Sequence, residues 1–172
     1  MNDDNVMRKV KLAKITLNIG AGKNEEALRK GVILLKMITG VDPIKTETRK
    51  RIPSWGLRPG LQIGAKITLR GKQAEEVLGR LLAAKENELS PKSFDNEGNV
   101  SFGIAEYIEI PGLEYNPDIK IIGLEVAVTL ERPGFRVKRR KISRKTLPQK
   151  QRISSQEAAG FLKEKYNIKV EA

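Results

Sequence analysis

Apolar and polar residues alternate with a period of two in four segments of the chain, and this alternation restricts the fold more than any other feature of the sequence. The segments are residues 11–19, 61–70, 99–110 and 119–131. Such alternation is typical of strands that have one face in a core and the other toward solvent. Four of these segments predict an antiparallel-rich sheet with one polar face.

Three other segments have helical signals. A first helix is expected to run from a cap at Asn24 to a stop at Gly40, and a second to cover residues 71–89. A third opens with a capping box between Ser154 and Glu157. Strands and helices together predict an α+β fold of two layers, with helices on one face of the sheet and an exposed polar face on the other. The 172 residues are expected to form a single domain.

The charge of the chain points to a polyanionic partner. Lys and Arg number 33 against 21 Asp and Glu, which gives a net charge of +12 and favours nucleic acid over an anionic membrane surface. The chain has no Cys and no His, so disulfides, thiolate nucleophiles, Cys/His zinc sites and histidine catalysis are excluded. No apolar run approaches the roughly 20 residues that span a bilayer. A cytoplasmic protein without membrane, cofactor, metal or small-molecule substrate is therefore expected.

The positive charge is concentrated in two connections, of which residues 132–152 are the longer. This segment has ten basic residues and no acidic residue, and apolar residues such as Phe135 and Leu147 are interleaved with them. A solvated charge run is one interpretation. An extension that anchors the protein to rRNA phosphates is the other, and it is favoured because the segment lies between a strand and a capped helix. The basic residues are Arg132, Arg136, Lys138, Arg139, Arg140, Lys141, Arg144, Lys145, Lys150 and Arg152.

The second connection is a basic loop at residues 45–60, which contains the only tryptophan of the chain, Trp55. Pro and Gly residues stiffen its bends. Trp55 could stack on nucleic acid, or it could fold back as a lid on the core. The surrounding cations favour an outward position for the loop as a whole. They are Arg49, Lys50, Arg51 and Arg58.

A turn of sequence G-A-G-K joins the first strand to the first helix. It does not fit the dinucleotide-binding pattern, because Glu25 stands at a position where that pattern needs Gly. It does not fit the P-loop pattern either, because Leu17 stands at a position where that pattern needs Gly. Simple turn geometry explains the glycines. A phosphate contact through Gly20, Gly22 and Lys23 is the main alternative, and a mononucleotide site is the remote one.

Three motifs in order, KITLNIGAGK, the TRKRIPSW loop before IGAKITLRG, and KSFDNEGNVSFGI, resemble the universal large-subunit ribosomal protein family that binds 5S rRNA and is conventionally numbered five. The resemblance covers residues 11–131. The basic segment after residue 131 and the ending EKYNIKVEA resemble the archaeal and eukaryotic branch, and the chain is interpreted as archaeal.

The resemblance implies a structural role in the central protuberance of the large subunit, together with 5S rRNA, large-subunit rRNA and a companion 5S-binding ribosomal protein. It implies that residues 49–60 contact the peptidyl-site tRNA. A non-ribosomal RNA chaperone or regulator remains an alternative, as does a carboxylate enzyme, although the paired acids Glu25–Glu26 and Glu75–Glu76 suit helix positions. The residues implied to face 5S rRNA are Lys14, Thr16, Asn18, Lys66, Thr68 and Arg70.

Overall fold

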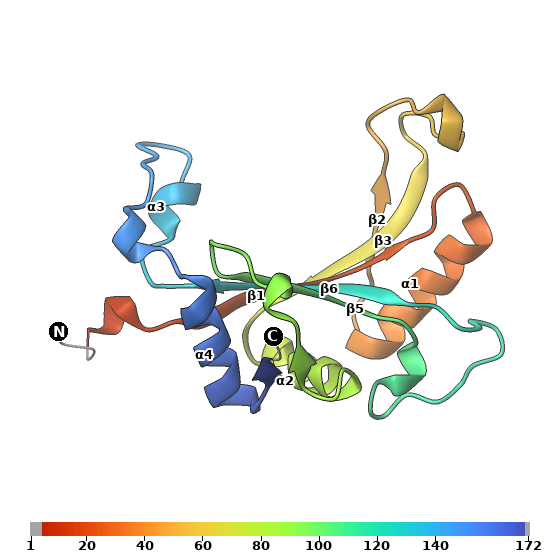
Figure 1. The fold of residues 1–172 in the computed structure, drawn as a ribbon. Coiled ribbons are helices and arrows are strands. Elements are labelled where there is room, and N and C mark those ends of the chain that lie inside the picture. The colour runs from red at the N-terminus through yellow and green to blue at the C-terminus, as the bar shows by residue number, and fades with distance from the viewer. Residues whose placement is uncertain (1–4, 171–172) are drawn as a thin grey trace.

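A five-stranded sheet forms the centre of the molecule in the computed structural model, which describes residues 5–170 (Figure 1). The strand order is β2-β3-β1-β6-β5, and all neighbouring strands are antiparallel. The expected α+β fold with an antiparallel-rich sheet is confirmed. The strands are β1 (Lys11–Gly20), β2 (Ile44–Glu47), β3 (Gln62–Leu69), β5 (Asn99–Ile104) and β6 (Leu124–Glu131).

Three helices, α1, α2 and α4, lie on one side of the sheet (Figure 1). The helix α3 lies apart from them, in the basic segment, and two short strands, β4 and β7, form a separate parallel pair. The bounds are α1 (Glu25–Thr39), α2 (Gly71–Ala84), α3 (Arg136–Arg139), α4 (Ser155–Tyr166), β4 (Glu88–Leu89) and β7 (Lys169–Val170).

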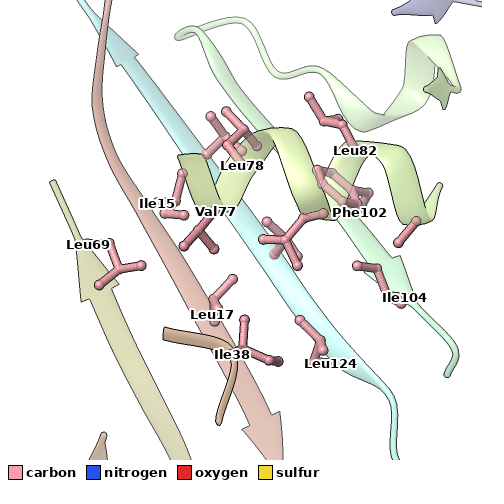
Figure 2. Close-up of a cluster of buried hydrophobic side chains, with 14 of the residues drawn as sticks. Ile15, Leu17, Ile38, Leu69, Val77, Leu78, Leu82, Phe102, Ile104 and Leu124 are labelled. Atoms are coloured by element: carbon pink, nitrogen blue, oxygen red, sulfur yellow. The ribbon is translucent and has the colours of Figure 1, made fainter. Parts of the chain in front are cut away.

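The core lies between the sheet and these helices. Ile15 and Leu17 of β1 are fully buried, as is Leu78 of α2. Figure 2 shows Leu78 and Leu82 of α2 beside inward side chains of β1 and β5. Burying each such side chain contributes about 1.5–3 kcal/mol, so the apolar half of each alternating strand holds the two layers together.

The helix ends predicted from the sequence are confirmed. The side chain of Asn24 accepts hydrogen bonds from the N–H groups of Glu26 and Ala27, at 3.0 and 3.2 Å. Gly40 ends α1 with a φ of 70°, and Ser154 forms a capping box at the start of α4. These bonds satisfy backbone groups that a helix end otherwise leaves unpaired.

Three predicted elements are shorter than expected. The second helix ends at Ala84 and not at residue 89, because Glu86 and Asn87 have left-handed φ values of 56° and 59°. The third alternating segment stops being a strand at Ile104, and β6 begins only at Leu124.

The connection between β5 and β6 is irregular but well packed. Tyr107 and Ile110 are buried, and the Tyr107 hydroxyl accepts a hydrogen bond from the N–H of Asn116 at 2.8 Å. Pro111, which has no N–H, and Gly112, with a φ of 83°, follow directly. The alternating apolar residues between β5 and β6 therefore belong to a packed loop and not to a strand.

Candidate nucleic-acid interface

The side chains of β1 and β3 that do not enter the core lie on the face opposite α1, α2 and α4. Thr16 is opposite Thr68 in the ladder, and Asn18 is opposite Lys66. Lys66, Thr68 and Arg70 are exposed, and the outward residues of β1 are half-buried. The six residues predicted to form one polar surface therefore share one face, which we call the open face.

Two further strands extend the open face, and their contribution was missed in the sequence. Glu125 of β6 is opposite Asn18, and Ala127 is opposite Thr16. Ser101 of β5 is in turn opposite Ala127. The alternation of residues 99–110 and 119–131 would have identified these positions. Ala127 and Ser101 add small side chains to this face, whereas Glu125 adds a carboxylate beside Asn18.

Hydrogen bonds cross the open face between strands. The hydroxyl oxygens of Thr16 and Thr68 are 3.4 Å apart, and the Asn18 side-chain amide donates to Glu125 at 3.2 Å. Hydroxyl groups can both donate and accept, and an amide offers both functions as well. The centre of the face can therefore bond to either donors or acceptors.

Two basic projections rise on the same side as the open face, at opposite ends of the sheet (Figure 1). One is the connection between β2 and β3, and the other is the basic segment that contains α3. The open face therefore has a separate cationic projection at each end of the sheet.

The connection between β2 and β3 is a compact hairpin loop. Its first predicted residue, Lys45, lies in β2, a four-residue edge strand that the sequence analysis did not predict. Ile52 and Leu57 exchange backbone hydrogen bonds of 3.1 and 3.0 Å, and Gly56 has a φ of 67°. These two bonds fix the backbone conformation of residues 52–57.

Trp55 is 67% exposed at the tip of this loop, whereas Leu57 is buried. The alternative in which Trp55 folds back as a lid on the core is therefore wrong. Arg49, Lys50, Arg51 and Arg58 are all exposed. The loop presents an indole ring and cations to solvent.

The G-A-G-K turn is explained by its own geometry. Gly22 has a φ of 57°, and the N–H groups of Ala21 and Gly22 both donate to the Ile63 carbonyl, at 2.8 and 3.0 Å. Gly20 pairs with Gly64 in the ladder between β1 and β3. The N–H of Gly22 is thus already used, which contradicts its predicted contact with phosphate.

Lys23 remains available beside the hairpin loop. It is exposed, and a Cβ atom added to Gly56 would lie 3.6 Å from its Cδ. Lys23 therefore adds its charge next to Gly56, which directly follows Trp55 in the loop.

Arg132 does not have the position expected of an rRNA anchor, because its side chain is 9% exposed and its donors point inward. Its Nε donates to the Arg8 carbonyl at 3.0 Å, and its Nη1 donates to the carbonyls of Lys150 and Arg152 at 3.3 and 3.1 Å. Its Nη2 lies 2.7 Å from Glu157. Arg132 organises the segment and is removed from the set of surface anchors.

The other cations of the basic segment divide into paired and unpaired groups. Lys138 and Arg152 pair with Glu97 at 3.2 and 3.7 Å, and Arg139 pairs with Glu131 at 2.9 Å. Six exposed cations have no acidic partner within residues 5–170, and they are the ones best placed for phosphate. They are Arg136, Arg140, Lys141, Arg144, Lys145 and Lys150.

One member of each acidic pair considered for catalysis is bonded to a lysine. Glu26 pairs with Lys30, whose hydrogen bond and charge lower the pKa of Glu26 below its ordinary value. Glu75 lies 2.6 Å from Lys165. Among residues 5–170, no group of three acidic, His or Cys side chains could hold a metal, and no helix is long and apolar enough to cross a membrane.

Comparison with known proteins decides the family. The family model of ribosomal protein L5 matches residues 5–58, and the model for the C-terminal part of the same family matches residues 62–164. The chain belongs to this ribosomal protein family. The two matches meet within the hairpin loop, and strands from both form the one five-stranded sheet.

Relatives resemble the chain over nearly its whole length. The large ribosomal subunit protein uL5 of Sulfurisphaera tokodaii is 48% identical, over 96% of this chain and 94% of its own. The uL5 proteins of Nanoarchaeum equitans and Methanosphaera stadtmanae are 44% and 41% identical, over 95% and 97% of this chain and 97% and 99% of theirs. The archaeal resemblance is confirmed, and so is the expectation of a structural ribosomal protein and not a carboxylate enzyme.

Proposed function

We propose that this chain is a structural constituent of the large ribosomal subunit that binds 5S rRNA through the open face. The observation that supports this most is the arrangement of small polar side chains in cross-strand rows, between two basic projections. Threonine, serine and asparagine side chains are short enough to let an RNA backbone approach closely. They can bond to 2′-hydroxyls and base edges, while Lys14, Lys66 and Arg70 at the margins neutralise phosphates.

The hairpin loop is proposed to contact the peptidyl-site tRNA. Its exposed cations suit the backbone that every tRNA shares, and Trp55 at the tip suits stacking on an unpaired base or packing against a sugar. Such contacts require no fixed sequence, which fits a partner that is exchanged in every elongation cycle.

The basic segment is proposed to anchor the protein to large-subunit rRNA through its six unpaired cations. With the companion 5S-binding ribosomal protein, the chain would then form part of the central protuberance, acting as one domain in the cytoplasm. A non-ribosomal RNA chaperone would also use basic loops, but relatives named as large-subunit proteins over nearly the whole chain favour the ribosome.

The test is a gel-shift titration of 5S rRNA with the full chain and the Asn18→Ala, Thr68→Ala double variant. Affinity should fall by roughly 1–3 kcal/mol for each well-formed hydrogen bond that the substitutions remove. Gln156→Ala, an exposed polar residue of α4 on the helix side, is the matched control and should leave affinity unchanged. Equal affinity of the double variant and the wild type, with the fold intact by circular dichroism, would place 5S binding elsewhere.

A further inference from the structure

A pocket of about 380 Å³ lies between the basic segment and the turn before β5. Its size is in the range of roughly 300–1,000 Å³ that is usual for sites of small ligands and cofactors. The charge pattern alone gives no reason for a pocket, since phosphate anchoring needs only a convex cationic surface. The lining residues that matter here are Glu97, Phe135, Lys138, Arg144, Lys145 and Leu147.

The wall at Glu97 is fixed by the turn before β5. Asp95 accepts hydrogen bonds from the N–H groups of Glu97 and Asn99, at 2.9 and 2.6 Å. Burial alone would raise the pKa of Asp95, but the bonds from Asn99 and Glu97 lower it below its ordinary value. The turn therefore holds Glu97 in place from the side of the sheet.

Glu97 in turn orients two cations. One carboxylate oxygen is 3.2 Å from Lys138 Nζ, and the other is 3.7 Å from Arg152 Nη1, which also lines the pocket. The Nε of Arg144 donates to the Lys138 carbonyl at 2.6 Å. The pocket is thus held together by bonds between segments that are far apart in the sequence.

The lining combines three kinds of chemistry. Four cations face one carboxylate, so the pocket attracts an anion. The Phe135 ring and Leu147 offer an apolar surface, and Lys138 Nζ lies 6.0 Å from the ring centroid. A site for phosphate alone needs neither the ring nor the carboxylate, whereas a nucleotide has a base plane for the ring and N–H or hydroxyl donors for Glu97.

We propose that this pocket binds one unpaired nucleotide of an rRNA strand, with the base against Phe135 and the phosphate at Lys145 and Arg144. A strand fits better than a free nucleotide, because exposed cations outside the pocket, such as Arg136 and Lys141, can bind the phosphates on either side. This inference rests on the proposed function, which identifies the RNA as rRNA. It adds that the contact selects an unpaired base that projects from the strand.

The experiment compares three RNA hairpins that differ at one position: a bulged 2-aminopurine, a bulged abasic site, and no bulge. The full-length wild type should bind the 2-aminopurine hairpin about 5- to 150-fold more tightly than the abasic one, the range that corresponds to stacking of one base on an aromatic ring. Fluorescence of the base should be quenched on binding. Phe135→Leu should reduce the difference to less than twofold, and Lys141→Gln, outside the pocket, should weaken all three RNAs equally.

Equal wild-type affinity for the 2-aminopurine and abasic hairpins, without quenching, would overturn the proposal. Competition by free AMP at micromolar concentration would overturn the RNA strand as the source of the nucleotide. A gel shift with 5S rRNA on the same samples separates the two levels. Retained 5S binding with no base preference refutes the pocket alone, and failure of the wild type to bind 5S rRNA refutes the proposed function.

Discussion

Arg132 Nη2 lies 2.7 Å from Glu157 Oε1, and this pair joins the end of β6 to the first turn of α4. The same guanidinium holds the carbonyls of Lys150 and Arg152, so it closes the basic segment into a loop. A segment of like charges repels itself unless something fixes its ends. The pair therefore explains how so basic a connection can have a defined path before it meets RNA.

The first prediction concerns the stability of the fold at low pH. Burial raises the pKa of Glu157, but hydrogen bonds from Ser154 and the charge of Arg132 lower it more, so its pKa lies below the ordinary value of 4.5. A carboxylate with a lowered pKa in the folded state contributes stability above the unfolded pKa, and this is lost as pH falls through the folded pKa. Stability measured by urea unfolding should therefore decline below about pH 4.5.

Glu157→Gln should flatten that decline and cost roughly 1–3 kcal/mol at pH 7. The lower part of this range applies because the Glu157 side chain is 45% exposed, so water screens its interaction with Arg132. Glu164→Gln, exposed on the same helix, is the control and should keep the wild-type pH profile. Identical profiles for all three proteins would show that the pair does not stabilise the fold.

The second prediction separates anchors from the organiser. Neutralising Arg136, Arg140 and Lys141 to Gln should reduce the slope of log affinity against log salt by about 0.7–0.9 for each phosphate that is no longer neutralised. Their exposure means that unfolding free energy should change by less than about 0.5 kcal/mol. Arg132→Gln should do the reverse, destabilising the fold while its properly folded fraction still binds RNA through the exposed cations. An unchanged slope in the triple variant would mean that those charges are merely solvated.

Much of the fold could be predicted because local signals agreed with the final packing. The alternation around Ile15 and Leu17, the cap at Asn24 and the stop at Gly40 each depend on neighbours in sequence. The errors arose where distant parts decided the outcome. The last turn predicted for α2 is replaced by β4 because β4 pairs with β7, which lies about 80 residues further along the chain, with Glu88 opposite Lys169.

The candidate interface was predictable in type but not in detail. Alternation places Thr16 and Thr68 outward, but only the register shows that they face each other. Arg132 and its neighbours are equivalent by composition, and only the fold separates one buried organiser from six exposed cations. The sequence did not decide whether the Trp55 side chain is exposed or buried. Leu57, only two positions away, is the large apolar residue of this loop that is buried.

The third prediction tests whether RNA approaches the open face closely. Ser101 is exposed at the centre of β5, so Ser101→Trp should leave stability nearly unchanged while the indole blocks close approach of RNA, and 5S affinity should fall at least tenfold. Gly64→Ala is a useful contrast. Its added Cβ would lie 2.7 Å from the Ile19 carbonyl oxygen, so overpacking should cost about 1–3 kcal/mol. Full 5S affinity of a folded Ser101→Trp protein would exclude the open face as the binding surface.

The last prediction concerns the hairpin loop. Neutralising Arg49, Lys50, Arg51 and Arg58 should leave 5S binding and subunit incorporation intact and increase tRNA dissociation from the peptidyl site, because the loop stands apart from the open face. Trp55→Ala should also speed dissociation, by an amount corresponding to about 1–3 kcal/mol if the ring stacks on a base. Trp55 is exposed, so its removal should hardly affect unfolding.

Leu57→Ala is the matched control for the loop, because Leu57 is buried only two residues from Trp55. Truncating a buried leucine costs about 2–5 kcal/mol, so this variant should lower stability without removing any group that could touch RNA directly. The measurement uses reconstituted subunits with normal 5S content and follows release of labelled tRNA. If the tryptophan and charge variants release tRNA at the wild-type rate, the loop does not contact tRNA. If they lose 5S rRNA instead, the loop belongs to the assembly interface, since its cations would then be bonding to the rRNA that holds the protein in place.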